Sequence, residues 1–137
     1  MFFPLLNQEE KESCLSLLVH AARCDDHFHE KEKNLIDGYS LLMGIAKETN
    51  RNLSIDDVIE YFANKSDVIR RAVFLETFGL ILSDSIYHAN EEKLIVKIAN
   101  SFGLDSDYIF ETKLWILEML PLYYKGFELV GIKFNKS

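Results

Sequence analysis

Apolar residues recur along most of the chain at intervals of three and four, the spacing of an amphipathic α-helix. The first such run carries Leu15, Leu18 and Val19. It follows Asn7, which has Glu10 three positions later, and this pair predicts a capping box at a helix start. The sequence therefore predicts a first helix that runs from about residue 8 to about residue 24.

Five further runs have the same period and are bounded by capping or breaking residues. Among these are Ser54, an N-cap before residue 55, and Gly44, placed for a left-handed C-terminal cap, with Gly103 in the same place in the repeat. The five runs predict helices at about 30–43, 55–63, 68–83, 89–102 and 106–120. The run at 68–83 is apolar nearly all round, since only Glu76 and Thr77 are polar between Val73 and Leu82. We expect this helix at the centre of a bundle, more buried than any other.

The C-terminal part of the chain gives a less uniform pattern. In the run at 106–120 we expect Ile109, Phe110, Trp115 and Leu117 in the core, and we expect Pro121 to end the helix. Residues 127–134 alternate loosely between apolar and polar. A short strand, a last helical turn and a segment lying on the bundle all fit this stretch.

One twelve-residue pattern occurs twice, at 25–36 and at 84–95. Both copies read Asp-x-x-aromatic-His-x-x-Glu-x-x-Leu-Ile, and the same offset of 59 residues pairs Gly44 with Gly103. The sequence thus predicts a helical hairpin used twice, with repeat one at about 8–45 and repeat two at about 67–104. We expect residues 1–137 to form a single-domain, all-α bundle of about six to seven helices with an internal pseudo-two-fold repeat.

The repeated residues have a ready interpretation as helix caps. Asp25 and Asp84 fall in the connections, where a carboxylate accepts backbone N–H groups left free at a helix start. Glu32 and Glu91 stand at the position from which a capping box reaches back. Leu35, Ile36, Leu94 and Ile95, one turn later, are expected in one shared core.

Composition and charge exclude several classes of function. A net charge of −7 with scattered Lys and Arg residues argues against a nucleic-acid-binding surface. Cys14 and Cys24 are ten residues apart on one predicted helix and cannot bridge each other, which favours a reducing compartment. No stretch approaches the ~20 apolar residues of a membrane span, and residues 1–6 lack the basic flank of a signal peptide.

The repeated pattern resembles the Ala-Asp-Gly-x-Ile-x-x-x-Glu signature of the TerB-like family, named for tellurite resistance. The resemblance covers roughly residues 8–120. It is carried by matched pairs of residues: Asp25 with Asp84, Phe28 with Tyr87, Glu32 with Glu91, and Gly44 with Gly103. Cys24 and Ser83 replace the family's alanine, and Asp26 and Ser85 replace its glycine.

The resemblance implies a fold and a broad function. TerB-like proteins are all-helical bundles with the signature at two hairpin turns, and they are associated with tellurite and general stress responses. No enzymatic activity is settled for them, although divalent-metal binding has been proposed. For this chain the resemblance implies a cytoplasmic, non-enzymatic module that binds a protein partner.

A divalent-metal site is the alternative. Two acidic turns brought together by the repeat would offer the oxygen ligands of Asp25, Glu32, Asp84 and Glu91 to a hard cation such as Ca²⁺. His27, His29 and His88 are secondary candidates, suited to Zn²⁺ or Ni²⁺. The capping interpretation explains the same carboxylates without an ion.

Chemistry beyond these turns has little support in the sequence. There is no Gly-rich phosphate loop, no nucleophile elbow and no His-Glu-x-x-His helix. His20 is expected on the surface or hydrogen-bonded in the core, and Glu76 on a stripe that reaches solvent. Two hypotheses follow: an interaction module, or a metal-dependent sensor or enzyme that uses the acidic turns.

Overall fold

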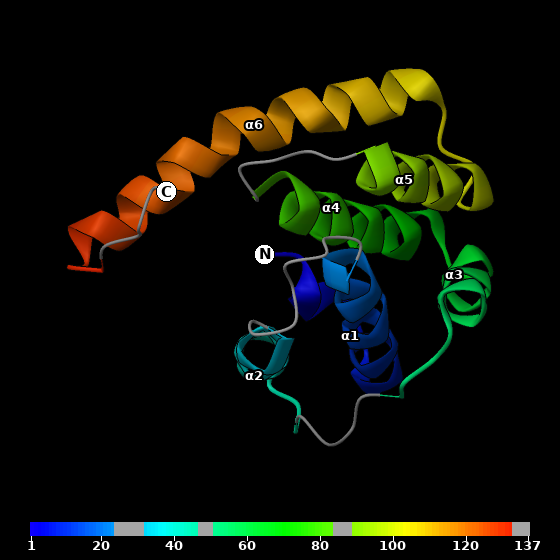
Figure 1. Ribbon diagram of the computed structural model, residues 1–137, viewed down its shortest axis with the longest axis horizontal. Helices are drawn as coiled ribbons and strands as arrows, with labels where there is room; N and C mark the ends of the chain where they lie inside the picture. The colour runs from blue at the N-terminus through cyan, green and yellow to red at the C-terminus, as the bar shows by residue number, and fades with distance from the viewer. Residues whose placement is uncertain (24–31, 47–50, 84–88, 133–137) are drawn as a thin grey trace.

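The computed structural model describes residues 1–23, 32–46, 51–83 and 89–132, with the side chains of 32–36 left out of the description. Within these ranges a short 3₁₀ helix, η1, precedes six α-helices (Figure 1). Their bounds are η1 Phe3–Leu5, α1 Gln8–Arg23, α2 Glu32–Met43, α3 Ile55–Ala63, α4 Asp67–Ser83, α5 Ala89–Ser101 and α6 Ser106–Leu129.

The predicted all-α class is confirmed. Every regular element in the described ranges is helical, and none of those ranges contains a strand. No described helix combines the length and the apolar character needed to cross a bilayer. The internal two-fold repeat as a whole stays a prediction, because both of its turns lie outside the described residues.

Helices begin where the sequence places capping side chains. The Asn7 backbone N–H donates to Glu10 Oε1 at 2.9 Å, and the Glu10 N–H donates to Asn7 Oδ1 at 2.8 Å. This is the predicted capping box. Ser54 caps α3 by accepting from the Asp57 N–H at 3.1 Å, as predicted.

Two helices end in the same way at positions 59 residues apart. Gly44, after α2, has φ +69°, and Gly103, after α5, has φ +72°. In each case the residue after the glycine donates its N–H back across the last turn: Ile45 to Ser40 O at 3.0 Å, and Leu104 to Ala99 O at 2.8 Å. These are Schellman caps, and they confirm the predicted left-handed conformation of both glycines.

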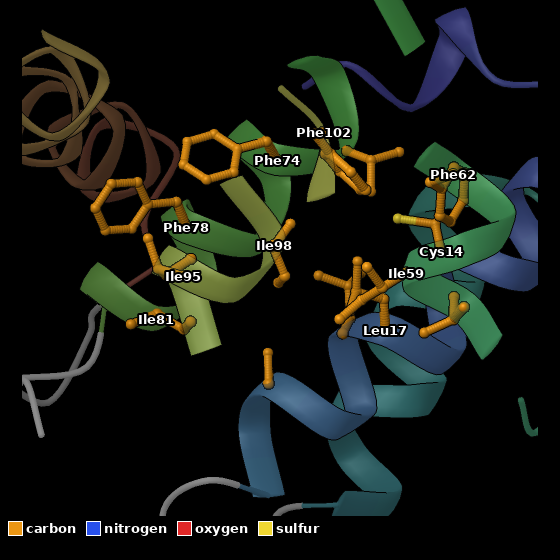
Figure 2. Close-up of a cluster of buried hydrophobic side chains, with 14 of the residues drawn as sticks. Cys14, Leu17, Ile59, Phe62, Phe74, Phe78, Ile81, Ile95, Ile98 and Phe102 are labelled. Carbon is orange, nitrogen blue, oxygen red and sulfur yellow. The ribbon is translucent and has the colours of Figure 1, made fainter. Parts of the chain in front are cut away.

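The core is shared by α1, α3, α4 and α5. Figure 2 shows Ile98 of α5 between the Phe74–Phe78 pair of α4 and side chains from α1 and α3. The predicted burial of Leu94 and Ile95 is confirmed, whereas the side chains of Leu35 and Ile36 lie outside the described part. These four helices therefore enclose one apolar core.

The prediction that the helix at 68–83 would be the most buried element is wrong. Nine of the 16 residues of α1 are buried, against six of the 17 residues of α4. Helix α4 does lie at the centre, in contact with η1, α1, α3, α5 and α6. Helix α4 is less buried than predicted because several of its apolar residues line a cavity and are therefore only half-buried.

Helix α6 departs from prediction in two respects. It does not end at Pro121, which lies inside the helix, but continues to Leu129 and closes with Gly131 at φ +93°. The buried residues of α6 are Thr112 and Ile116, whereas Phe110, Trp115 and Leu117 are exposed. The stretch 127–134, left open by the sequence, is therefore helical at its start, and residues 133–137 lie outside the description.

Candidate functional site

Most of the predicted acidic site falls outside the described residues. This is true of Asp25 and Asp84, and of the secondary candidates His27, His29 and His88. Glu32 begins the described backbone of α2, but its side chain is not part of the description. Among the four predicted carboxylates, the structure therefore places Glu91.

Glu91 lies in the first turn of α5 and is only 3% exposed. A carboxylate buried to this extent needs hydrogen-bond donors or a cation. Its place near a helix start fits the capping interpretation. No cluster of three or more His, Cys, Asp and Glu side chains suited to a metal ion occurs within the described ranges.

Two titratable residues of α1, His20 and Cys14, have structural roles. His20 Nε2 lies 2.7 Å from the carbonyl oxygen of Leu53, and the Leu53 N–H donates to Ser16 Oγ at 3.3 Å. These bonds fasten the segment before α3 to α1, as expected of a hydrogen-bonded histidine. Cys14 is fully buried, and burial raises the pKa of its thiol well above the usual range. It is therefore a packing residue.

The structure adds a cavity that the sequence did not predict. Its volume is about 240 Å³, and it lies between the N-terminal residues, α2, α4 and the middle of α6. The start of the chain, marked N in Figure 1, lies beside α4. Tyr39, Leu80, Trp115 and Tyr123 are among its lining residues. The walls are thus mostly aromatic and aliphatic.

Glu76 is the charged side chain of this cavity. Its Oε1 accepts from the Phe2 N–H at 2.6 Å and lies 2.9 Å from the Met1 ammonium. The side chain is 12% exposed, so the expectation that it would lie on a solvent-facing stripe is wrong. The N-terminal segment covers it, a contact between residues 74 apart that no local pattern reveals.

Tyr39 is affected by the same carboxylate. Burial is the main cause that raises the pKa of its hydroxyl above the ordinary value, and the negative charge of Glu76 adds to it. The Tyr39 ring also meets Phe3 edge-on, with centroids 5.8 Å apart. The hydroxyl therefore stays protonated, available as a hydrogen-bond donor in the cavity wall.

A second feature lies on the opposite side of α6. Phe110, Leu114, Leu117 and Pro121 follow one another at spacings of four, three and four, which puts them on one face of the helix. The exposures are 64% for Phe110, 46% for Leu114 and 45% for Leu117, and Pro121 is also exposed. We call these four residues the outer stripe. The face toward α4 carries Thr112 and Ile116 instead.

Sequence reasoning missed both features for identifiable reasons. The outer stripe has the period of a core face, and this period predicts Phe110 and Leu117 in the core because α6 has apolar residues on two sides. The cavity had a weaker signal: a lone acid, Glu76, and a glycine, Gly79, in an otherwise apolar helix. Neither residue by itself indicates a site.

Comparison with known proteins gives no relatives: no protein-family model, no curated protein and no solved structure matches the chain.

Proposed function

We propose that this chain is a non-enzymatic interaction module of the TerB-like kind, which acts in a stress response in the cytoplasm by binding a protein partner. The outer stripe of α6 is the observation that carries this proposal. The acidic turns remain part of the proposed surface, as the sequence suggests. The outer stripe supplies the apolar part of that partner surface.

The stripe suits a partner helix. Apolar residues at spacings of four, three and four form a seam that packs against a matching seam on another helix. Lys113 and Glu118 flank the stripe, and such flanking charges select the partner and its register in paired helices. A helix that exposes a row of large apolar side chains to water gains free energy when a partner covers them.

Two further observations support the proposal. The thiol of Cys14 is free, fully buried and held in its protonated form, which fits a protein without cysteine chemistry and a reducing compartment. The all-helical bundle and the paired caps at Gly44 and Gly103 agree with what the family resemblance implies. The partner and the stress response rest on that resemblance.

Site-specific photo-crosslinking tests the proposed partner surface. With a photoreactive benzoylphenylalanine in place of Leu114, in cells that naturally make this chain, we expect one discrete adduct. Val96 on α5 is a matched control because it is an apolar residue of similar exposure, 41%, on another helix, and a probe there is expected to give no such adduct.

The companion variant Leu117→Glu places a charge in the stripe next to the probe and is expected to abolish the adduct while leaving the fold intact. An adduct of twice the mass of the chain would identify a second copy as the partner. Absence of any adduct at position 114, or equal adducts at 114 and 96, would contradict the proposed surface.

The divalent-cation site is the second candidate, and the buried carboxylate of Glu91 is the described feature that favours it. If the repeated acids are helix caps, calorimetric titration with Ca²⁺, Mg²⁺, Mn²⁺ and Zn²⁺ is expected to give no saturable heat. Saturable binding to the wild type that is lost in Asp84→Asn and kept in Asp105→Asn would establish the metal site instead. Asp105 is a matched control because it caps α6 outside the repeat.

A further inference from the structure

The cavity under α6 combines long apolar walls with one charged side chain. Leu75 and Leu80 of α4 line it together with Trp115 and Met119 of α6, and among the described lining residues Glu76 has the only side chain with a formal charge. Cavities of this kind, with an apolar body and a few fixed polar groups, are typical of small-molecule sites. The volume, about 240 Å³, limits the ligand to a small one.

Gly79 provides independent evidence of open space. It lies within α4 and lines the cavity, and a Cβ built at this position would meet no atom within 4 Å. Packing therefore does not require a glycine here, although glycine inside a helix lowers stability relative to alanine. The missing side chain leaves the cavity wider at the turn that carries Glu76.

The carboxylate of Glu76 determines which ligand head group fits. Both of its contacts, with Phe2 and with Met1, are made through Oε1. A carboxylate has about four lone-pair sites on its two oxygens, so Glu76 keeps capacity for another donor. Because Glu76 is 12% exposed, a charge placed beside it is less screened by water than one at the surface.

We propose that this cavity is a binding site for a small amphiphilic primary amine. The ammonium group of the ligand binds Glu76, and its apolar body lies along the wall formed by Leu80, Trp115 and Met119. The Met1 ammonium occupies the same position in the free protein. The Met1 side chain is 43% exposed, so the residue lies at the edge of the cavity and can move into water when the ligand enters. An anionic head group would meet the charge of Glu76 and is rejected.

Three probes of equal length and different head groups test this chemistry: octylammonium, octanol and octanoate. Trp115 reports on binding because it lines the cavity and is the single tryptophan of the chain. We expect octylammonium to change the Trp115 fluorescence saturably, and calorimetry to give the same dissociation constant. Octanoate is expected to bind least.

The variant Glu76→Gln isolates the role of the charge. Glutamine keeps an oxygen that accepts from the Phe2 N–H, so the fold is expected to persist. The affinity for octylammonium is expected to fall about tenfold or more, because its ammonium group no longer meets a negative charge, and the affinity for octanol to stay unchanged. Glu92→Gln, an exposed residue of α5, is the matched control and should change neither.

The variant Gly79→Leu isolates the role of the space. A Cβ at this position meets no atom within 4 Å, and we expect the rest of the leucine side chain to fill the cavity, so all three probes should lose affinity. Gly126→Leu is the control, because Gly126 lies in α6, has equal room for a side chain and does not line the cavity.

The outcomes separate this proposal from the proposed function. If Glu76→Gln binds octylammonium, like octanol, with the same affinity as the wild type, the proposed amine ligand is wrong. If no probe binds saturably, the proposed site itself is wrong. Neither result bears on the partner surface, because the outer stripe lies on the other side of α6 and is tested by crosslinking.

Discussion

Replacing Phe74 with alanine is expected to lower the free energy of unfolding by about 3–5 kcal/mol. The side chain is fully buried at the centre of the bundle, and its ring contacts Phe78 at 5.5 Å and Tyr108 at 5.8 Å between centroids. Its removal leaves a cavity between α4 and α6 that neighbouring side chains cannot fill without leaving their rotamers. Urea-induced unfolding followed by circular dichroism measures the loss.

Phe110→Ala is the matched control, since it makes the same chemical change at a residue that is 64% exposed. We expect a change within about 0.5 kcal/mol, as for most surface substitutions. The pair also tests the orientation of α6. If Phe110→Ala costs as much as Phe74→Ala, the outer stripe is buried and the proposed partner surface does not exist.

Alkaline pH is expected to destabilise the protein through Cys14. An unfolded cysteine ionises with a pKa of about 8.5, whereas burial raises the pKa of the folded Cys14 thiol well above that value. Above pH ~8.5 the unfolded chain therefore binds fewer protons at this site than the folded protein, and stability falls as pH rises. The slope of the free energy of unfolding approaches about 1.4 kcal/mol per pH unit, and the total loss between pH 7 and pH 10 is about 2 kcal/mol.

The variant Cys14→Ala isolates this contribution. This variant is less stable at neutral pH because the core lacks the thiol group. Its free energy of unfolding is expected to fall less steeply with rising pH, because the ionisation of Cys14 no longer contributes. Other groups whose pKa is raised without any influence of Cys14, such as Tyr108, are present in both proteins and cancel in the difference. Parallel pH profiles for the two proteins would contradict the burial of this thiol in its protonated form.

The helices and their ends were largely determined by the sequence alone. The capping box of Asn7 and Glu10, the Ser54 cap and the two Schellman glycines all formed where the pattern predicted them. Each depends on bonds between residues within about one or two turns, so neighbouring residues suffice to specify it. The same holds for the buried faces of α3 and α5, where a single apolar stripe leaves one way to pack.

The orientation of α6 was decided by tertiary structure. This helix has apolar residues on two faces, and periodicity cannot say which of them meets α4. Packing buries Thr112 and Ile116, whose smaller or aliphatic side chains allow close approach, and leaves Phe110 outside. Pro121 is tolerated inside the helix at an exposed position, and aromatic contact between Tyr123 and Phe127, at 4.9 Å, supports the turns that follow.

The cavity is likewise a product of the fold. Glu76 meets Phe2 across 74 residues of chain, and α6 supplies the opposite wall from still farther along the sequence. The sequence identifies the lone acid and the glycine of α4, but only the packed arrangement gives them a shared space. Contacts between distant residues depend on the packing of the whole bundle, whereas caps and helix faces depend on near neighbours, and this difference separates what could be predicted from what could not.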